Sequence, residues 1–203
     1  MNIVCLDLEG VLIPEIWIAL ADATGIDELR ATTRDEPDYD KLMRFRLGVL
    51  EKNGLGIAEL DAAAQSIEPL PGALAFLASL RERFQVVILS DTYYELTGPA
   101  MKKLGYPTLF CHRLEIANDG RVAGYRLRMP DHKTAAVQAF KGLGFKVLAA
   151  GDSYNDTGML GAADTGFLFC APASVVAEFP AFAPITTYEE LLAAFAGAWG
   201  FNG

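Results

Sequence analysis

Residues 2–12, NIVCLDLEGVL, form the stretch of sequence that decides the fold. Residues 2–8 are a short apolar run rich in residues that favour β-structure, which predicts a buried strand ending in a turn at Glu9-Gly10. Asp7 and Glu9 stand at the end of this strand. Such a pair can provide a carboxylate nucleophile beside a proton donor and acceptor, although acids also end strands for solubility or turn formation.

Three further apolar runs also end in small or acidic residues. They lie at 85–89, 146–150 and 166–170. Helical periodicity separates the runs, at 72–83, 93–104 and 133–143. Strand and helix alternation predicts an α/β fold with a doubly wound parallel sheet, which binds ligands at the carboxyl ends of its strands. Asp7, Ser90 and Asp152 all fall at those ends.

The connection from Gly10 to the strand at 85 is far longer than a simple crossover, which predicts an inserted unit. It shows helical periodicity at 15–24, 39–51 and 57–67. We therefore expect a core domain at 1–13 and 70–203 and a helical cap domain at 14–69, placed as a lid over the strand ends.

Two smaller features complete the expected organisation. Alternating apolar and polar residues on either side of Asn118-Asp119-Gly120 predict a β-hairpin at 109–129 that protrudes from the sheet. Residues 191–199 have the pattern of a closing amphipathic helix.

Composition excludes several classes of protein. With 52% hydrophobic and 21% charged residues, the chain is typical of a globular protein and not of a disordered one. The net charge of −9, without a basic run, argues against a nucleic-acid partner. No apolar run of about 18 residues and no signal peptide is apparent, so we expect no membrane partner and a cytoplasmic location. The cysteines, Cys5, Cys111 and Cys170, are expected to be buried thiols in a reducing compartment.

A second acidic cluster, GDSYND at 151–156, follows the strand at 146–150. Carboxylates this close repel one another unless a hard divalent cation relieves the conflict, and magnesium prefers such oxygen ligands. No group of histidines and cysteines indicates zinc. An Asx turn followed by a helix N-cap is the alternative explanation of these residues.

Four motifs in a fixed order resemble the haloacid dehalogenase-like (HAD) phosphatases and phosphotransferases: DLEGVL at 7–12, VILSD at 87–91, Lys133 within DHKTAA, and GDSYND at 151–156. The match in order and spacing runs over the whole chain. The resemblance implies that Asp7 is a nucleophile that becomes phosphorylated and that Glu9 occupies the place of the general acid/base. An enzyme that works through an aspartyl phosphate is therefore expected.

The resemblance also implies which residues hold the cofactor and the phosphoryl group. The expected ligands of Mg²⁺ are Asp7, Glu9 through its carbonyl, Asp152 and Asp156. Ser90 and Lys133 are expected around the phosphoryl group, and Asp91 and Asn155 are expected among the substrate-binding residues. Ser90 and Lys133 would offer hydrogen bonds and positive charge to the transferring oxygens, which are the main needs of phosphoryl transfer.

Within the superfamily, the cap position, the hairpin and the stretch GDSYNDTGML most resemble phosphoserine phosphatases. This resemblance implies that Glu15 pairs with a substrate ammonium group and that Arg46 binds a substrate carboxylate bidentately. Arg44 is the competing choice for the carboxylate. Surface salt bridging on a helix is the alternative for each of these residues.

Two residues depart from the family pattern, since Glu9 replaces the usual second aspartate and Asp91 replaces a glycine. A longer acid displaces the proton donor, which favours an acceptor other than water. With glutamate at position 9, the chain resembles a group of bacterial enzymes that combine phosphoserine hydrolysis with phosphoryl transfer to homoserine. We therefore expect phosphoserine as donor, water or homoserine as acceptor, and possible homodimers.

Two rival functions remain open. One is hydrolysis of another small phosphorylated metabolite, such as a sugar or nucleotide phosphate, on the same fold. The other is a receiver-like signalling domain, which also carries a phosphorylated aspartate beside magnesium. Receivers lack a large helical insert and place that aspartate on a middle strand, which argues against the second reading.

Overall fold

A computed structural model describes residues 1–33, 35, 36 and 38–200 of the chain. Its centre is a sheet in the order β4-β3-β2-β1-β5-β6-β7, in which every strand but β4 pairs in parallel. The strands are β1 (Asn2–Leu6), β2 (Gln85–Tyr93), β3 (Thr108–Ile116), β4 (Val122–Arg126), β5 (Lys146–Gly151), β6 (Thr165–Phe169) and β7 (Ala183–Ile185). The predicted α/β class is confirmed.

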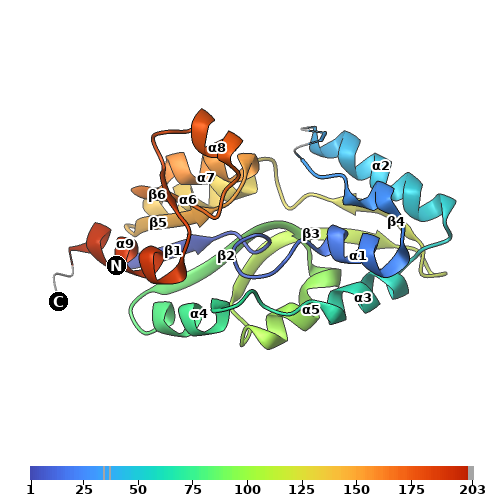
Figure 1. Cartoon of the computed structure of the whole chain (residues 1–203), viewed down its shortest axis with the longest axis horizontal. Helices are drawn as coiled ribbons and strands as arrows, with labels where there is room; N and C mark the ends of the chain where they lie inside the picture. Colours follow the sequence, from blue (N-terminus) through green and yellow to red (C-terminus); the bar gives the residue numbers. More distant parts are fainter. Residues whose placement is uncertain (34, 37, 201–203) are drawn as a thin grey trace.

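Helices cover both faces of the sheet (Figure 1). One face carries α4 (Ala73–Arg81), α5 (Tyr94–Lys103) and α9 (Tyr188–Trp199), and the other carries α6 (His132–Gly142), α7 (Thr157–Ala162) and α8 (Ala173–Glu178). Each face has its own buried apolar cluster. This two-sided burial explains why β1 and β5 are continuous apolar runs.

The long connection between β1 and β2 forms the helical insert α1 (Ile16–Thr24), a 3₁₀ turn at Asp27–Arg30, α2 (Tyr39–Lys52) and α3 (Ile57–Ser66). These elements gather beyond the carboxyl end of β1, beside the β3–β4 hairpin (Figure 1). One buried cluster runs from β1 into α1 and α3, including Leu6, Trp17 and Leu60. Because the insert and the sheet share this cluster, the division into a core domain at 1–13 and 70–203 and a cap domain at 14–69 stays a proposal.

The β3–β4 hairpin, which was expected to protrude from the sheet, contacts the helical insert. Ile57 N, at the start of α3, donates to Gly120 O at the hairpin tip at 2.9 Å. A Cβ at Gly56 would lie 2.6 Å from the same oxygen, so this close contact requires glycine there. Tyr125 of β4 also donates from its hydroxyl to Asp40 of α2.

The end of β2 differs from the prediction. The strand was expected to end before Ser90, but it continues to Tyr93, and its pairing with β3 shifts register between Leu89 and Tyr93. A shift of this kind is typical of a bulge, which redirects side chains near functional sites. Ser90 and Asp91 are therefore held inside a strand instead of following it.

Burial of the cysteines was predicted correctly for Cys5 and Cys111 but wrongly for Cys170. Cys170 follows β6 in the left-handed region, with φ of 50°, and its exposed thiol donates to Thr186 O. An apolar neighbourhood in sequence did not reveal this turn. Among the described residues, no helix is long and apolar enough to cross a membrane.

Candidate active site

The carboxyl ends of two neighbouring strands bring the two acidic motifs together. Asp7 follows β1, Asp152 follows β5, and Asp7 N donates to Ala150 O at 3.0 Å, which continues the pairing of these strands. Carboxylate oxygens of Asp7, Asp152 and Asp156 all lie within 4.8 Å of one another. Residues almost 150 positions apart in sequence thus form one cluster.

Two glycines make room for these carboxylates. A Cβ at Gly10 would lie 2.5 Å from the carboxylate carbon of Asp152, and a Cβ at Gly151 would lie 2.3 Å from that of Asp156. Gly10 also has a φ of 77°, a conformation that other residues rarely adopt. The glycines in DLEG and GDSYND are therefore requirements of the site's packing.

Lys133, at the start of α6, places its buried ammonium group among three carboxylates. Its Nζ lies 2.7 Å from Asp156 Oδ1, 3.0 Å from Asp7 Oδ1 and 3.2 Å from Asp91 Oδ2. Although burial lowers the pKa of Lys133, Asp156 and Asp7 raise it well above its ordinary value. The lysine therefore remains charged at neutral pH.

One ammonium group does not neutralise the cluster. Burial, together with the charges of Asp156 and Asp152, raises the pKa of Asp7 well above its ordinary value despite Lys133. Asp156 also accepts the N–H groups of Asp152 and Ser153, at 3.0 and 3.1 Å, which fixes it beneath the loop. A crowd of oxygen ligands with excess negative charge fits a hard divalent cation.

Glu9 connects the loop after β1 to the helical insert. Its Oε1 accepts the N–H of Ile16, the first residue of α1, at 2.7 Å. Burial, followed by the charge of Glu15, raises the pKa of Glu9 to about 8. Its carboxylate lies outside the group formed by Asp7, Asp152 and Asp156, and the predicted role of its carbonyl as a metal ligand stays a prediction.

One pocket unites most of the predicted site residues, namely Asp7, Glu9, Glu15, Arg46, Ser90, Asp91, Asp152 and Asn155. Lys133 and Asp156 contact this set from buried positions. Ser90 is also buried, and its Oγ accepts the N–H of Thr92 at 3.3 Å. The pocket thus lies between strand ends of the core and helices of the insert.

The structure separates the two candidate arginines. Arg46 is buried in the pocket wall, donates from Nη2 to Ala31 O at 2.8 Å, and lies 4.5 Å from the centroid of the Trp17 ring. Its buried Nε has no hydrogen-bond partner among the described residues. Arg44 instead pairs with Asp40 on the exposed side of α2.

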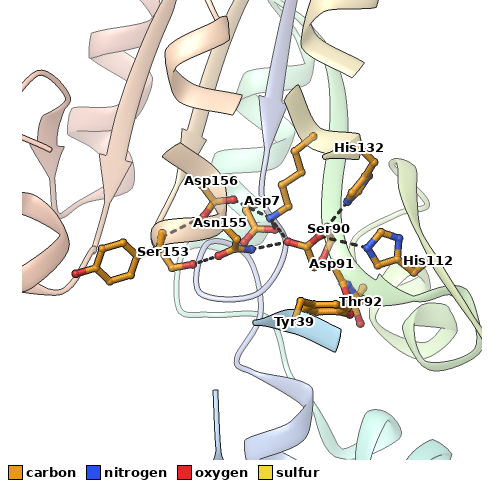
Figure 2. A network of polar contacts seen from close by, with 12 residues as sticks. Asp7, Tyr39, Ser90, Asp91, Thr92, His112, His132, Ser153, Asn155 and Asp156 are labelled. Carbon is orange, nitrogen blue, oxygen red and sulfur yellow. Dashed lines mark hydrogen bonds and ion pairs between the residues drawn. The ribbon is translucent and has the colours of Figure 1, made fainter. Parts of the chain in front are cut away.

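The sequence prediction missed three residues around Asp91, which are His112, His132 and Tyr39. Figure 2 shows both imidazoles pointing toward the Asp91 carboxylate, with Nε2 to Oδ1 distances of 3.3 Å for His112 and 3.2 Å for His132. Tyr39 donates from its hydroxyl to Asp91 O at 2.8 Å. The only available signal was that the chain contains just two histidines.

Comparison with known proteins agrees with this fold and site. The family model of haloacid dehalogenase-like hydrolases matches residues 1–164. "Phosphoserine phosphatase ThrH" of Pseudomonas aeruginosa is 58% identical over 94% of this chain and 93% of that protein. A "Phosphoserine phosphatase" of Pseudomonas syringae pv. tomato is 57% identical over 94% of this chain and 81% of that protein.

Solved structures show the same fold. A phosphoserine phosphatase in apo form aligns with a TM-score of 0.78 at 21% identity, over 95% of this chain and 98% of that chain. A substrate-bound phosphoserine phosphatase complex gives 0.79 at 20% identity, over 95% and 97%. The parallel sheet and its carboxylate-lysine centre define a hydrolase of the haloacid dehalogenase-like class. Within that class, the chain belongs to the phosphoserine phosphatase family.

Proposed function

We propose that this protein is a magnesium-dependent phosphoserine phosphatase that forms an aspartyl phosphate on Asp7 and passes the phosphoryl group to water or homoserine. The observation that carries the proposal is a single pocket lined by Asp7 and Asp152 and also by Glu15 and Arg46. It joins groups suited to phosphoryl transfer with groups suited to an amino acid. The names of the two close relatives support phosphoserine as the donor.

In the first step, an oxygen of Asp7 attacks phosphorus and the bond from phosphorus to the serine oxygen breaks. Glu9, protonated because of its raised pKa, gives its proton to the departing serine oxygen. Lys133, Ser90 and Asn155 donate hydrogen bonds to the phosphoryl oxygens. Magnesium, held by Asp7, Asp152, Asp156 and the Glu9 carbonyl, would supply further positive charge near these oxygens.

In the second step, an acceptor hydroxyl attacks the phosphorus of phospho-Asp7 while ionised Glu9 takes its proton. The bond from phosphorus to the Asp7 oxygen breaks, which restores both carboxyl groups. Water as acceptor gives inorganic phosphate, and homoserine gives phosphohomoserine. The hydrogen bond from Ile16 N holds Glu9 beside the cap, where an alcohol acceptor would enter.

Substrate recognition is assigned to the cap. Arg46 would bind the carboxylate of phosphoserine and Glu15 would bind its ammonium group. The buried Arg46 Nε supports this role, because a donor without a partner costs free energy that a bound carboxylate would recover. Transfer to homoserine, homodimer formation and a cytoplasmic location belong to the same set of proposals.

A competition assay tests the proposal. Purified protein receives phosphoserine and magnesium, with and without homoserine, while inorganic phosphate and phosphohomoserine are measured. We expect phosphate alone in the first case, both products in the second, and neither after chelation of magnesium. Formation of neither product with magnesium present would refute the proposed function.

A matched substrate tests the role of Arg46. Phosphoethanolamine has the ammonium and phosphate groups of phosphoserine but lacks the carboxylate, so its kcat/KM should be lower by about 10²-fold or more. Equal turnover of both compounds would leave phosphatase activity standing but would remove the assigned substrate.

A further inference from the structure

The Asp91 carboxylate has more donors than any role in binding substrate requires. Its Oδ1 faces the Nε2 atoms of His112 and His132, and its Oδ2 faces the Asn155 amide (Figure 2). The same Oδ2 lies 3.2 Å from Lys133 Nζ. The donors come from β3, from α6 and from the 3₁₀ turn at Tyr154–Asp156 after β5. One carboxylate thus joins a histidine pair on one side to the phosphoryl-binding donors on the other.

The hydrogen bonds of His112 indicate its tautomer. Arg128 N donates to His112 Nδ1 at 3.1 Å, so Nδ1 offers its lone pair and neutral His112 carries its proton on Nε2. That Nε2–H points at Asp91 and donates to it. The same assignment argues against a metal ion bound by Asp91, His112 and His132, because the ring has no second lone pair to offer.

His132 has a narrower set of contacts. It is buried, its Nε2 lies 3.2 Å from Asp91 Oδ1, and its Nδ1 has no hydrogen-bond partner among the described residues. Its ring packs edge-on against His112 with centroids 4.5 Å apart. The hydrogen bond to Asp91 is therefore the one polar contact of the His132 ring among the described residues.

We infer that Asp91 competes with the bound phosphoryl group for Lys133 and Asn155, and that His112 and His132 hold the Asp91 carboxylate when the phosphoryl group takes those donors. The inference rests on the proposed function, which assigns Lys133 and Asn155 to the phosphoryl oxygens. It adds a role for the residue that replaces the family's usual glycine.

Geometry and charge indicate that, of the carboxylates around Lys133, Asp91 is the one that a bound phosphoryl group displaces. Of the three carboxylates around Lys133, Asp91 lies farthest from Nζ, at 3.2 Å against 2.7 and 3.0 Å. Its side chain is 28% exposed, whereas the Asp7 and Asp156 side chains are 6% and 0% exposed. An anion beside a phosphoryl group also repels it. The consequence is weak binding of inorganic phosphate and rapid release of that product.

The first test measures binding of inorganic phosphate by calorimetry in the presence of magnesium. Asp91→Asn removes the charge but keeps the shape, so we expect phosphate to bind at least about tenfold more tightly than to the native protein. Asp119→Asn, in the exposed hairpin turn, makes the same change in net charge and should bind phosphate as the native protein does. Unchanged or weaker binding by Asp91→Asn would overturn the inference.

The second test uses the histidine. His132→Leu removes one donor from Asp91, which frees the carboxylate to pair more closely with Lys133, so phosphate should bind several-fold more weakly, opposite to Asp91→Asn. His132→Gln keeps a donor near the position of Nε2 and should change binding less. In the Asp91→Asn background, His132→Leu should have no further effect; an equal loss there would show that His132 does not act through Asp91.

Failure of the inference differs from failure of the proposed function. If phosphate binds to neither the native protein nor Asp91→Asn, the phosphoryl site itself is wrong, and the proposed function falls with the inference. If the native protein hydrolyses phosphoserine and binds phosphate, but Asp91→Asn does not bind phosphate more tightly, only the inference falls.

Discussion

The core side of the site and its cap side are built differently. We call Asp7, Lys133, Asp152 and Asp156 the core half, because they follow strands or begin a helix of the sheet domain. Asp156 there accepts two main-chain N–H groups and contacts Lys133, which also contacts Asp7. The cap half, Glu15, Tyr39 and Arg46, consists of single side chains on or beside helices of the insert.

This difference teaches which part of the function depends on the fold itself. The core half is fixed by strand pairing and by close contacts at Gly10 and Gly151, so its geometry changes little unless the sheet changes. The cap half can be altered one side chain at a time. Substitutions in the core half should therefore abolish chemistry, and those in the cap half should change substrate preference.

The largest effect is expected for Asp7→Asn. Loss of the proposed nucleophile should lower turnover of phosphoserine by on the order of 10⁴- to 10⁶-fold. The stability of the folded protein, in contrast, should not fall. The raised pKa of Asp7 means that the folded state disfavours the charged carboxylate. At a pH above the ordinary pKa of aspartate, the native carboxylate therefore lowers the free energy of unfolding. Without magnesium, Asp7→Asn should therefore melt at or above the native temperature near pH 7.

Retained turnover in Asp7→Asn would contradict the mechanism. A lower melting temperature without magnesium would instead show that contact with Lys133 outweighs the repulsion from Asp156 and Asp152. The native protein treated with a chelator is the control for the melting measurement, because it lacks the metal but keeps every side chain.

Glu9→Gln tests the point where the two halves meet. The amide oxygen of glutamine can still accept from Ile16 N, so the start of α1 should be kept while the proton donor is lost. Turnover should fall by about 10²- to 10⁴-fold, the usual contribution of general acid/base catalysis. Steady-state kinetics with phosphoserine measures the loss, and native activity in this variant would assign proton transfer to another group.

Arg46→Lys should mainly affect recognition. Lysine keeps the charge but loses the planar guanidinium, which packs over Trp17 and is proposed to bind the substrate carboxylate through two hydrogen bonds. We expect kcat/KM for phosphoserine to fall about 10²- to 10³-fold, with a much smaller fall for phosphoethanolamine, which has no carboxylate. Arg44→Lys is the matched control, and an equal loss in that variant would exclude the assignment.

Most of the core half could be predicted from sequence because its signals are local. A strand is visible in residues 2–8, and Asp7 and Glu9 stand at its end. The close contacts at Gly10 and Gly151 became visible only in the structure. Parallel strands then bring their carboxyl ends to one edge, which places Asp7 beside Asp152. Lys133 was predicted only from the family resemblance, because a lysine at the start of a helix is not unusual by itself.

The cap half and the surroundings of Asp91 could not be predicted in this way. Arg44 and Arg46 lie about 200° apart around α2, and only the packing of that helix decides which one enters the pocket. His132 and Asp91 are 41 positions apart and come from different elements, so no local pattern joins them. The exposed Cys170 was missed because its turn depends on backbone conformation, not on apolar neighbours.

The smallest effect is expected for Tyr39→Phe, which removes a direct link between the cap half and β2, the strand that carries Ser90 and Asp91. The Tyr39 hydroxyl donates to Asp91 O at 2.8 Å and lies 2.7 Å from the Tyr93 hydroxyl. A hydrogen bond contributes about 0.5–1.5 kcal/mol, so KM for phosphoserine should rise about two- to tenfold while kcat stays nearly native. Steady-state kinetics separates the two constants.

Tyr125→Phe is the control for this last effect. Its hydroxyl also joins the cap to the sheet, through Asp40, and its ring lies 6.1 Å from that of Tyr39, but the hydroxyl has no contact with Asp91. If both variants raise KM equally, the cap is merely loosened in each. If Tyr39→Phe alone raises KM, the tyrosine acts through the strand that carries Ser90 and Asp91, and the cap half then positions that part of β2 as well as selecting the substrate.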